Sequence, residues 1–231
     1  MLASKIRRIL LPILLMMGVF TLSVFHFTEA ASQEDEVAKA VEDIRKQIER
    51  EIQSHPALAM SSNPYDYVER LSGVDAMVRL GPSALPYIEQ AIDESSGSGL
   101  MDYLLAVAAE TISKVDLKRG PSALWNTGDS FTRQWRQQLR QTPQEVQKIA
   151  SSGLSPDEKV RSLERLGVPA VPFIIEQVKE GNQELFPAIV SILSGGPTAS
   201  PDRFSDETKW IRENEKRFND LKSYVLSKSE E

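Results

Sequence analysis

The chain has 231 residues, a formal net charge of −6 and 41% hydrophobic residues, which is typical of one folded domain or at most two small ones. It has no cysteine and only two histidines, His26 and His55. This composition excludes disulfides, zinc–thiolate sites, iron–sulfur clusters, cysteine nucleophiles and multi-histidine metal sites, so we expect no metal and no cofactor.

Residues 1–30 have the three-part pattern of an export signal. A basic start precedes an uncharged apolar run over 9–25, and Ala30 ends a short stretch suited to cleavage. The apolar run is almost long enough to span a bilayer, so an uncleaved membrane anchor is the alternative. In both cases the basic start stays inside and the remainder crosses the membrane. The sequence predicts an extracytoplasmic protein, secreted after cleavage near Ala30 or anchored through residues 9–25.

The charge that remains after residues 1–30 argues against binding to nucleic acid. Their removal takes away three cations and one anion, namely Lys5, Arg7, Arg8 and Glu29. The rest of the chain then has 24 cations and 32 anions, a net charge of −8. Nucleic acids and anionic lipids need clustered positive charge, so neither is an expected ligand.

An amphipathic helix is predicted between Gln33 and Ser54. Its apolar residues recur at spacings of four and three among charged ones: Val37, Val41, Ile44, Ile48 and Ile52. This narrow stripe can pack on the rest of the chain or on a partner helix, and we expect the former. Residues 55–64 are rich in Pro and Ser, so residues 31–63 are interpreted as an amphipathic helix and a linker.

Every segment beyond Pro64 has helical spacing, and strand alternation never coincides with a hairpin signal. A first stripe ends at Gly81, Asp129 or Ser130 caps a later helix, and Thr142-Pro143 opens a separate short one. The remaining helices are expected at 82–92, 100–113, 156–166, 168–180, 182–194 and 204–226. The predicted class is all-α, with a helical domain over 64–226 and a disordered tail over 227–231.

An internal repeat is the strongest signal in the chain. Residues 79–88 align without a gap with residues 165–174, at a spacing of 86. Leu-Gly ends one helix in each copy, and Pro86 and Pro172 lie in the first turn of the next. Helix pairs that repeat in this way bury their apolar faces only by stacking. A spacing of 86 corresponds to two units of about 43 residues, within the range of HEAT and armadillo repeats.

The motif Leu-Gly-x-x-Ala-Val/Leu-Pro-Tyr/Phe-Ile resembles the short HEAT-like repeat of many bacterial scaffold proteins. The resemblance implies a short right-handed α-solenoid, in which 100–113 and 183–194 are inner helices. The turns at 96–99 and 181–183 lack the Asp that such repeats often carry, so the units are divergent.

Two features between the aligned segments are candidate binding residues. Trp125 lies in a Trp-Asn-Thr-Gly loop, where it either anchors a ligand or joins the core. Arg133, Arg136 and Arg140 share one face of a helix, where they either receive an acidic partner or form a solvated face. Trp135 and Trp210 are interpreted as core.

The residues that could support catalysis lack positioned partners. His55 precedes Pro56 in the linker, and Asp157-Glu158 stands where a helix cap belongs. We therefore expect an exported, non-catalytic, HEAT-like scaffold that binds a protein partner at the cell envelope. The alternatives are a cell-wall or polysaccharide binder that uses exposed aromatic residues, and a carboxylate-based hydrolase.

Overall fold

The computed structural model describes residues 33–229, except 62, 96–98, 119–124 and 195–205. All regular structure within these residues is helical, and none of it is strand. The predicted all-α class is therefore confirmed for this part of the chain. The export segment predicted at 1–30 lies outside it. None of the described helices is long and apolar enough to cross a membrane.

The α-helices after a first helix over 33–54 are α2 (Tyr65–Val68), α3 (Ser72–Arg79), α4 (Leu85–Asp93), α5 (Leu100–Ser113), α6 (Gly128–Ala150), α7 (Pro156–Glu164), α8 (Val171–Lys179), α9 (Phe186–Leu193), α10 (Glu207–Asn214) and α11 (Asn219–Ser227). Short 3-10 helices lie between several of them: η1 (Pro56–Met60), η2 (Pro82–Ala84), η3 (Val168–Ala170), η4 (Gln183–Leu185) and η6 (Glu215–Phe218).

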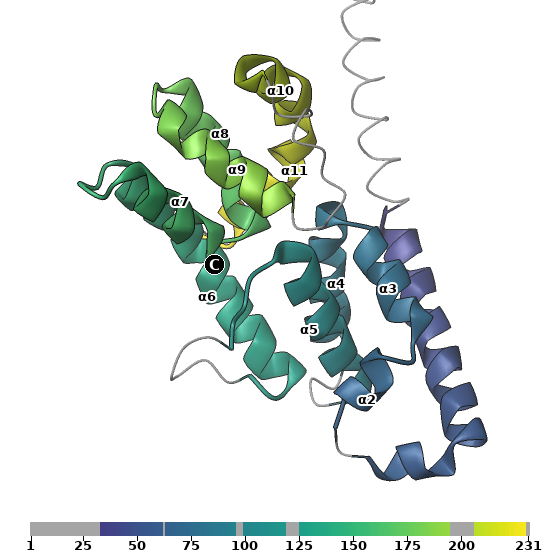
Figure 1. Ribbon diagram of the computed structural model, residues 1–231. Coiled ribbons are helices and arrows are strands. Elements are labelled where there is room, and N and C mark those ends of the chain that lie inside the picture. The colour runs from purple at the N-terminus through teal and green to yellow at the C-terminus, as the bar shows by residue number, and fades with distance from the viewer. Residues whose placement is uncertain (1–32, 62, 96–98, 119–124, 195–205, 230–231) are drawn as a thin grey trace, which may run out of the picture.

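The helix over 33–54 packs on the outer side of α3 (Figure 1). Ile44 of this helix is fully buried, and Gln47 Oε1 accepts a hydrogen bond from the Gly73 backbone N–H at 3.0 Å. A β-carbon at Gly73 would lie only 2.7 Å from Ile44 Cγ1, so the close approach needs glycine at this position. The expectation that the amphipathic stripe packs on the rest of the chain is confirmed. Part of the expected linker also packs, because Leu58 of η1 is buried.

Two three-helix units share several of their helix boundaries at a spacing of 86 residues. The first unit is α3, α4 and α5, and the second unit is α7, α8 and α9. The η2–α4 segment covers 82–93 and the η3–α8 segment covers 168–179, while α5 and α9 begin at Leu100 and Phe186. Gly81 has φ 76° and ψ −165°, and Gly167 has φ 66° and ψ −161°. The two aligned segments are therefore the same backbone junction.

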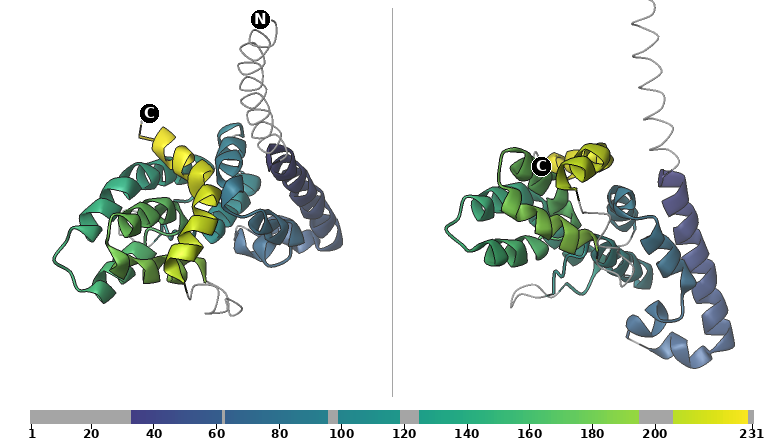
Figure 2. Two further views of the ribbon diagram at one scale, coloured as in Figure 1. Left: turned by 90° about the horizontal axis from the view of Figure 1, so that it is seen from above. Right: turned by 45° about the horizontal axis from the view of Figure 1, so that its top comes forward.

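The helices are arranged in two rows. The first row contains α3, α5, α7 and α9, and the second row contains α4, α6, α8 and α11. In the second row α4 packs on α6, α6 on α8, and α8 on α11. In the first row α3 packs on α5 and α7 packs on α9, but α5 and α7 are not a closely packed pair. Figure 1 shows the two units as separate groups, with the long α6 reaching across both. Figure 2 shows the same grouping from two further directions. The first row is thus interrupted between α5 and α7.

The helix of 23 residues that joins the two units differs from the prediction. Thr127, not Asp129 or Ser130, is the N-cap of α6, and its side chain accepts a hydrogen bond from the Ser130 N–H. Thr142-Pro143 does not open a new helix, because α6 runs on through Pro143. The Thr142 hydroxyl donates to the Gln138 carbonyl at 2.8 Å within this stretch. Buried residues on both sides of Pro143 hold α6 in one piece, which outweighs the usual cost of an internal proline.

Two other helical boundaries also differ from the sequence pattern. The stripe expected to end at Gly81 is divided between α2 and α3, and the helix expected at 204–226 is interrupted by η6. The boundary at Ser155 is confirmed, since Glu158 Oε2 accepts the Ser155 N–H at 2.9 Å in a capping box.

Candidate functional site

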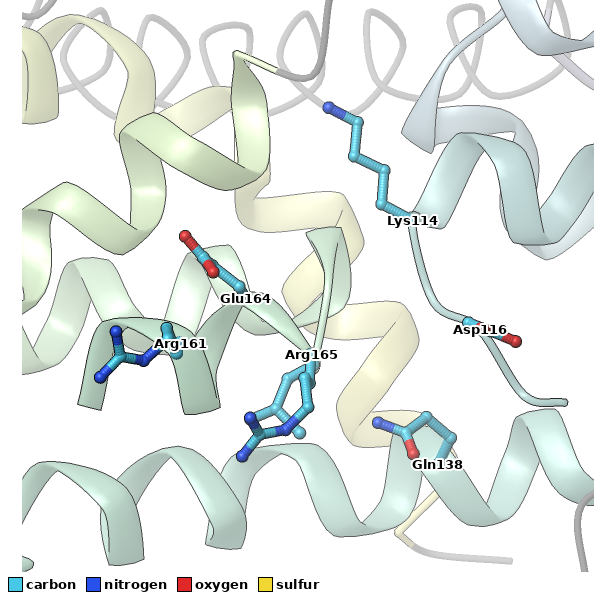
Figure 3. A pocket seen from close by; sticks show the side chains of 7 residues that line it. Lys114, Asp116, Gln138, Arg161, Glu164 and Arg165 are labelled. Carbon is cyan, nitrogen blue, oxygen red and sulfur yellow. The ribbon is translucent and has the colours of Figure 1, made fainter. Parts of the chain in front are cut away.

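A groove of about 680 Å³ lies at the interruption of the first row. The turn after α5, the middle of α6 and the end of α7 form it. Its lining residues are Lys114, Asp116, Gln138, Arg161, Glu164, Arg165 and Leu166. Figure 3 shows Gln138 on α6, with the α7 side chains on one side and the turn after α5 on the other. Because both units contribute, the groove exists only where they meet.

Gly167 sets how closely the two units approach. A β-carbon there would lie 2.4 Å from the Ser113 carbonyl oxygen and 2.8 Å from Val115 Cγ2. At the equivalent Gly81, nothing lies within 4 Å of the same position. The turn before η3 therefore rests directly on the end of α5, beside the groove.

Lys114 fixes the opposite wall of the groove. It ends α5 in the left-handed conformation, at φ 56°, and its Nζ donates to the Ile192 carbonyl of α9 at 2.6 Å. Burial lowers the pKa of Lys114. This ammonium therefore ties the first unit to the second and is already engaged.

The two arginines of the groove carry its accessible positive charge. Arg161 and Arg165 are both exposed; Arg161 lies in α7, and Arg165 is the C-cap residue one helical turn later. Figure 3 shows their guanidinium groups extending from α7 toward the same side, while Glu164 extends away from them. The groove is thus lined by charged side chains, and the guanidinium donors of Arg161 and Arg165 extend to one side of it.

The predicted arginine stripe does not line this groove. Arg133 and Arg140 are exposed on α6, but residue 140 is turned by about 200° from Gln138 around the helix axis. Arg136 is only half-exposed and belongs to an internal ion-pair network. The three arginines share one face of α6, but they do not share one environment.

That network joins the ends of the chain's second row. Arg136 Nε donates to Glu89 Oε1 of α4 at 2.6 Å, and its Nη2 pairs with Asp93. Glu89 is 3% exposed, and it also accepts hydrogen bonds from Lys228 Nζ at 3.1 Å and from the Tyr224 hydroxyl. Burial and the Glu89 carboxylate together raise the pKa of Tyr224 well above its ordinary value. Arg136 therefore belongs to an ion-pair network within the chain, in contrast to the exposed Arg133 and Arg140.

Trp125 is buried in an aromatic cluster, with 2% of its surface exposed. Its ring contacts Tyr103 at a centroid distance of 4.6 Å, and its Nε1 donates to Glu110 Oε1 at 3.0 Å. Lys118 Nζ lies 4.0 Å from the Trp125 ring centroid and donates to the Tyr103 hydroxyl at 2.7 Å. The ring has no free face for a ligand. Trp135 and Trp210 are buried as predicted.

Comparison with known proteins gives no relative. No protein-family model matches the chain, and no curated protein or solved structure matches it significantly. Within the described residues, no group of His, Asp and Glu side chains is suited to holding a metal ion.

The groove residues had only weak signals in the sequence. Arg161 and Arg165 are an i, i+4 pair on a predicted helix, but such pairs usually form an ordinary solvated face. Nothing in the local pattern distinguishes Gln138 from its neighbours on α6. Arg161, Arg165 and Gln138 line one groove only because α5 and α7 do not pack closely against each other in the folded chain.

Proposed function

We propose that this chain is an exported, HEAT-like repeat scaffold that binds a protein partner at the cell envelope and has no catalytic activity. The observation that carries the proposal is the groove of about 680 Å³ at the junction of the two equivalent units. Stacked helix pairs commonly present such surfaces to partners. The matching η2–α4 and η3–α8 segments, with equivalent junctions at Gly81 and Gly167, support the repeat assignment.

The export part of the proposal depends on residues 1–30. Three cations before an apolar run favour transfer of the remainder across the membrane, with either cleavage near Ala30 or anchoring through residues 9–25. Protease added to intact spheroplasts should then digest the folded part of the chain. Complete protection would contradict export.

The absence of catalysis is supported by how the candidate groups are engaged. The buried Glu89 carboxylate already accepts from Arg136, Lys228 and Tyr224. His55 is an exposed side chain that pairs only with Glu51 among the described residues, at 3.3 Å. Neither arrangement presents a free acid and base to a substrate.

Protein binding is favoured over the polysaccharide alternative because Trp125 is buried. Sugar binding of the predicted kind needs an exposed aromatic face, and this ring contacts Tyr103, Phe131 and Lys118 instead. The groove offers charged and amide groups, which suit a polypeptide.

A groove-filling variant tests the proposal. Gln138→Trp in the tagged full-length chain places a large ring at the floor of the groove, and Gln137→Trp places the same ring on an exposed position of α6. We expect capture from envelope extract to recover one protein partner in fixed ratio with wild type and Gln137→Trp, and to lose it with Gln138→Trp. Equal recovery with both variants, or recovery of polysaccharide without protein, would contradict the proposal.

A further inference from the structure

We propose that the groove receives an extended acidic segment of the partner, in which carboxylates at alternate residues bind Arg161 and Arg165. This inference rests on the proposed function and adds the chemistry of the ligand.

Neither guanidinium group, that of Arg161 or that of Arg165, is paired with a carboxylate of the described residues. Among the described residues, Arg165 donates only to the Ser162 hydroxyl, at 3.0 Å, and Arg161 forms no ion pair with a carboxylate. Arg136 on α6 shows the contrast, since it is held by Glu89 and Asp93. A guanidinium fork matches a carboxylate with two parallel hydrogen bonds. Arg161 and Arg165 are therefore available to bind carboxylates from outside.

The spacing of Arg161 and Arg165 along the chain suits an extended ligand. Residues four apart on a helix are separated by about 6 Å along its axis, so the backbone positions of Arg161 in α7 and of Arg165 at its C-cap lie about that far apart. In an extended chain, alternate side chains on one face are about 6.7 Å apart. An acidic residue at every second position therefore matches the pair. Gln138, on the α6 side of the groove, adds an amide that can donate to and accept from the backbone of such a segment.

Side chains of both charges line the groove. Asp116 and Glu164 line the same groove, so its formal charge is only slightly positive. A polymer with a phosphate at every unit would meet these carboxylates as well as the arginines. A peptide can leave neutral or basic residues opposite them. The groove therefore favours spaced carboxylates over a uniform polyanion.

Fluorescence anisotropy with defined peptides tests the inference. The probe is a fluorescein-labelled peptide with Glu alternating with Ser, and the matched probe has Gln in place of each Glu. The protein is the full-length chain, at physiological ionic strength, where screening over about 8 Å suppresses repulsion by the net negative body. The groove variant is Arg161→Glu/Arg165→Glu. The control is Arg133→Glu/Arg140→Glu, which makes the same charge change at exposed positions away from the groove.

We expect the Glu probe to bind wild type and the control variant alike, and to bind the groove variant at least about tenfold more weakly. The Gln probe should bind none of them. Equal loss in both double variants, equal binding of the Gln probe, or tighter binding of polyphosphate of the same charge would each overturn the inference. If the Glu probe fails while partner capture remains sensitive to Gln138→Trp, this inference falls and the proposed function stands. If the Glu probe does not bind and partner capture is also insensitive to Gln138→Trp, both the inference and the proposed function are contradicted.

Discussion

Gly81 and Gly167 have the same backbone conformation but different surroundings, which makes them a matched pair at the scale of single residues. Their φ and ψ values lie in a region that is essentially restricted to glycine. The Ser113 carbonyl of the first unit lies against Gly167, whereas nothing lies within 4 Å of the equivalent position at Gly81. The conformation belongs to the repeated junction, and the contact belongs to the stacking of units.

Gly81→Ala and Gly167→Ala should therefore differ in cost. We expect Gly81→Ala to lower the free energy of unfolding by about 1–3 kcal/mol, from backbone strain alone. Gly167→Ala should cost more, because its β-carbon would lie 2.4 Å from the Ser113 oxygen. Chemical denaturation of both variants measures the difference. Equal costs would mean that the two units are not in close contact at this turn.

The internal ion pairs of Arg136 predict a second contrast. Arg136→Glu would set a new carboxylate against the 3% exposed Glu89 and against Asp93. We expect a loss of about 3–5 kcal/mol, as for other broken buried pairs. Arg133→Glu changes an exposed side chain and should alter stability by less than about 0.5 kcal/mol. Thermal unfolding of both variants checks this, and a stable Arg136→Glu variant would contradict the network.

Glu110 predicts a dependence on pH. Burial raises the pKa of its carboxyl group above the usual 4.5, despite hydrogen bonds from Trp125 and Leu117. The folded state then holds the proton more tightly than the unfolded state, so this contribution to stability is lost as pH rises from 4.5 through the folded pKa. Glu110→Gln should remove that contribution. The free energies of unfolding of wild type and variant, compared between about pH 4 and 7, test it; parallel profiles would contradict the shift.

At the scale of elements, the periodic helices could be predicted and the interruptions could not. The stripes over 33–54 and 85–92, and the cap at Ser155, are local patterns that fix a helix face or its start. Pro143 is also a local pattern, but buried residues before and after it keep α6 continuous. The environments of Trp125 and Arg136 depend on residues far away in the chain, such as Glu110 and Glu89. Their roles therefore needed the fold.

Gly73 controls how the helix over 33–54 docks. Gly73→Leu should displace this helix from α3, because the first atom of the new side chain already meets Ile44 Cγ1 at 2.7 Å. We expect faster backbone hydrogen exchange over 33–54 with little change in α7 and α8. Gly153→Leu is the control, since nothing lies within 4 Å of a β-carbon there. Unchanged exchange in the Gly73 variant would show that this contact does not hold the helix.

For the whole molecule, the sequence of the repeated junction occurs a third time in the chain. Residues 120–124 repeat residues 81–85 letter for letter, as Gly-Pro-Ser-Ala-Leu. They lie between α5 and α6 in the sequence, outside the described residues. Glycines 81, 120 and 167 are then 39 and 47 residues apart, with a mean of 43. The long α6 accounts for the larger interval and spans the gap that becomes the groove.

We propose that a protein partner occupies the groove between the two units. Photo-crosslinking in the native envelope tests it most directly, with a photoreactive residue placed at Gln138 in the groove or at Gln137 on an exposed position of the same helix. We expect the Gln138 position to give one protein adduct of defined mass and the Gln137 position to give none. No protein adduct at Gln138, or the same adduct from both positions, would contradict the account.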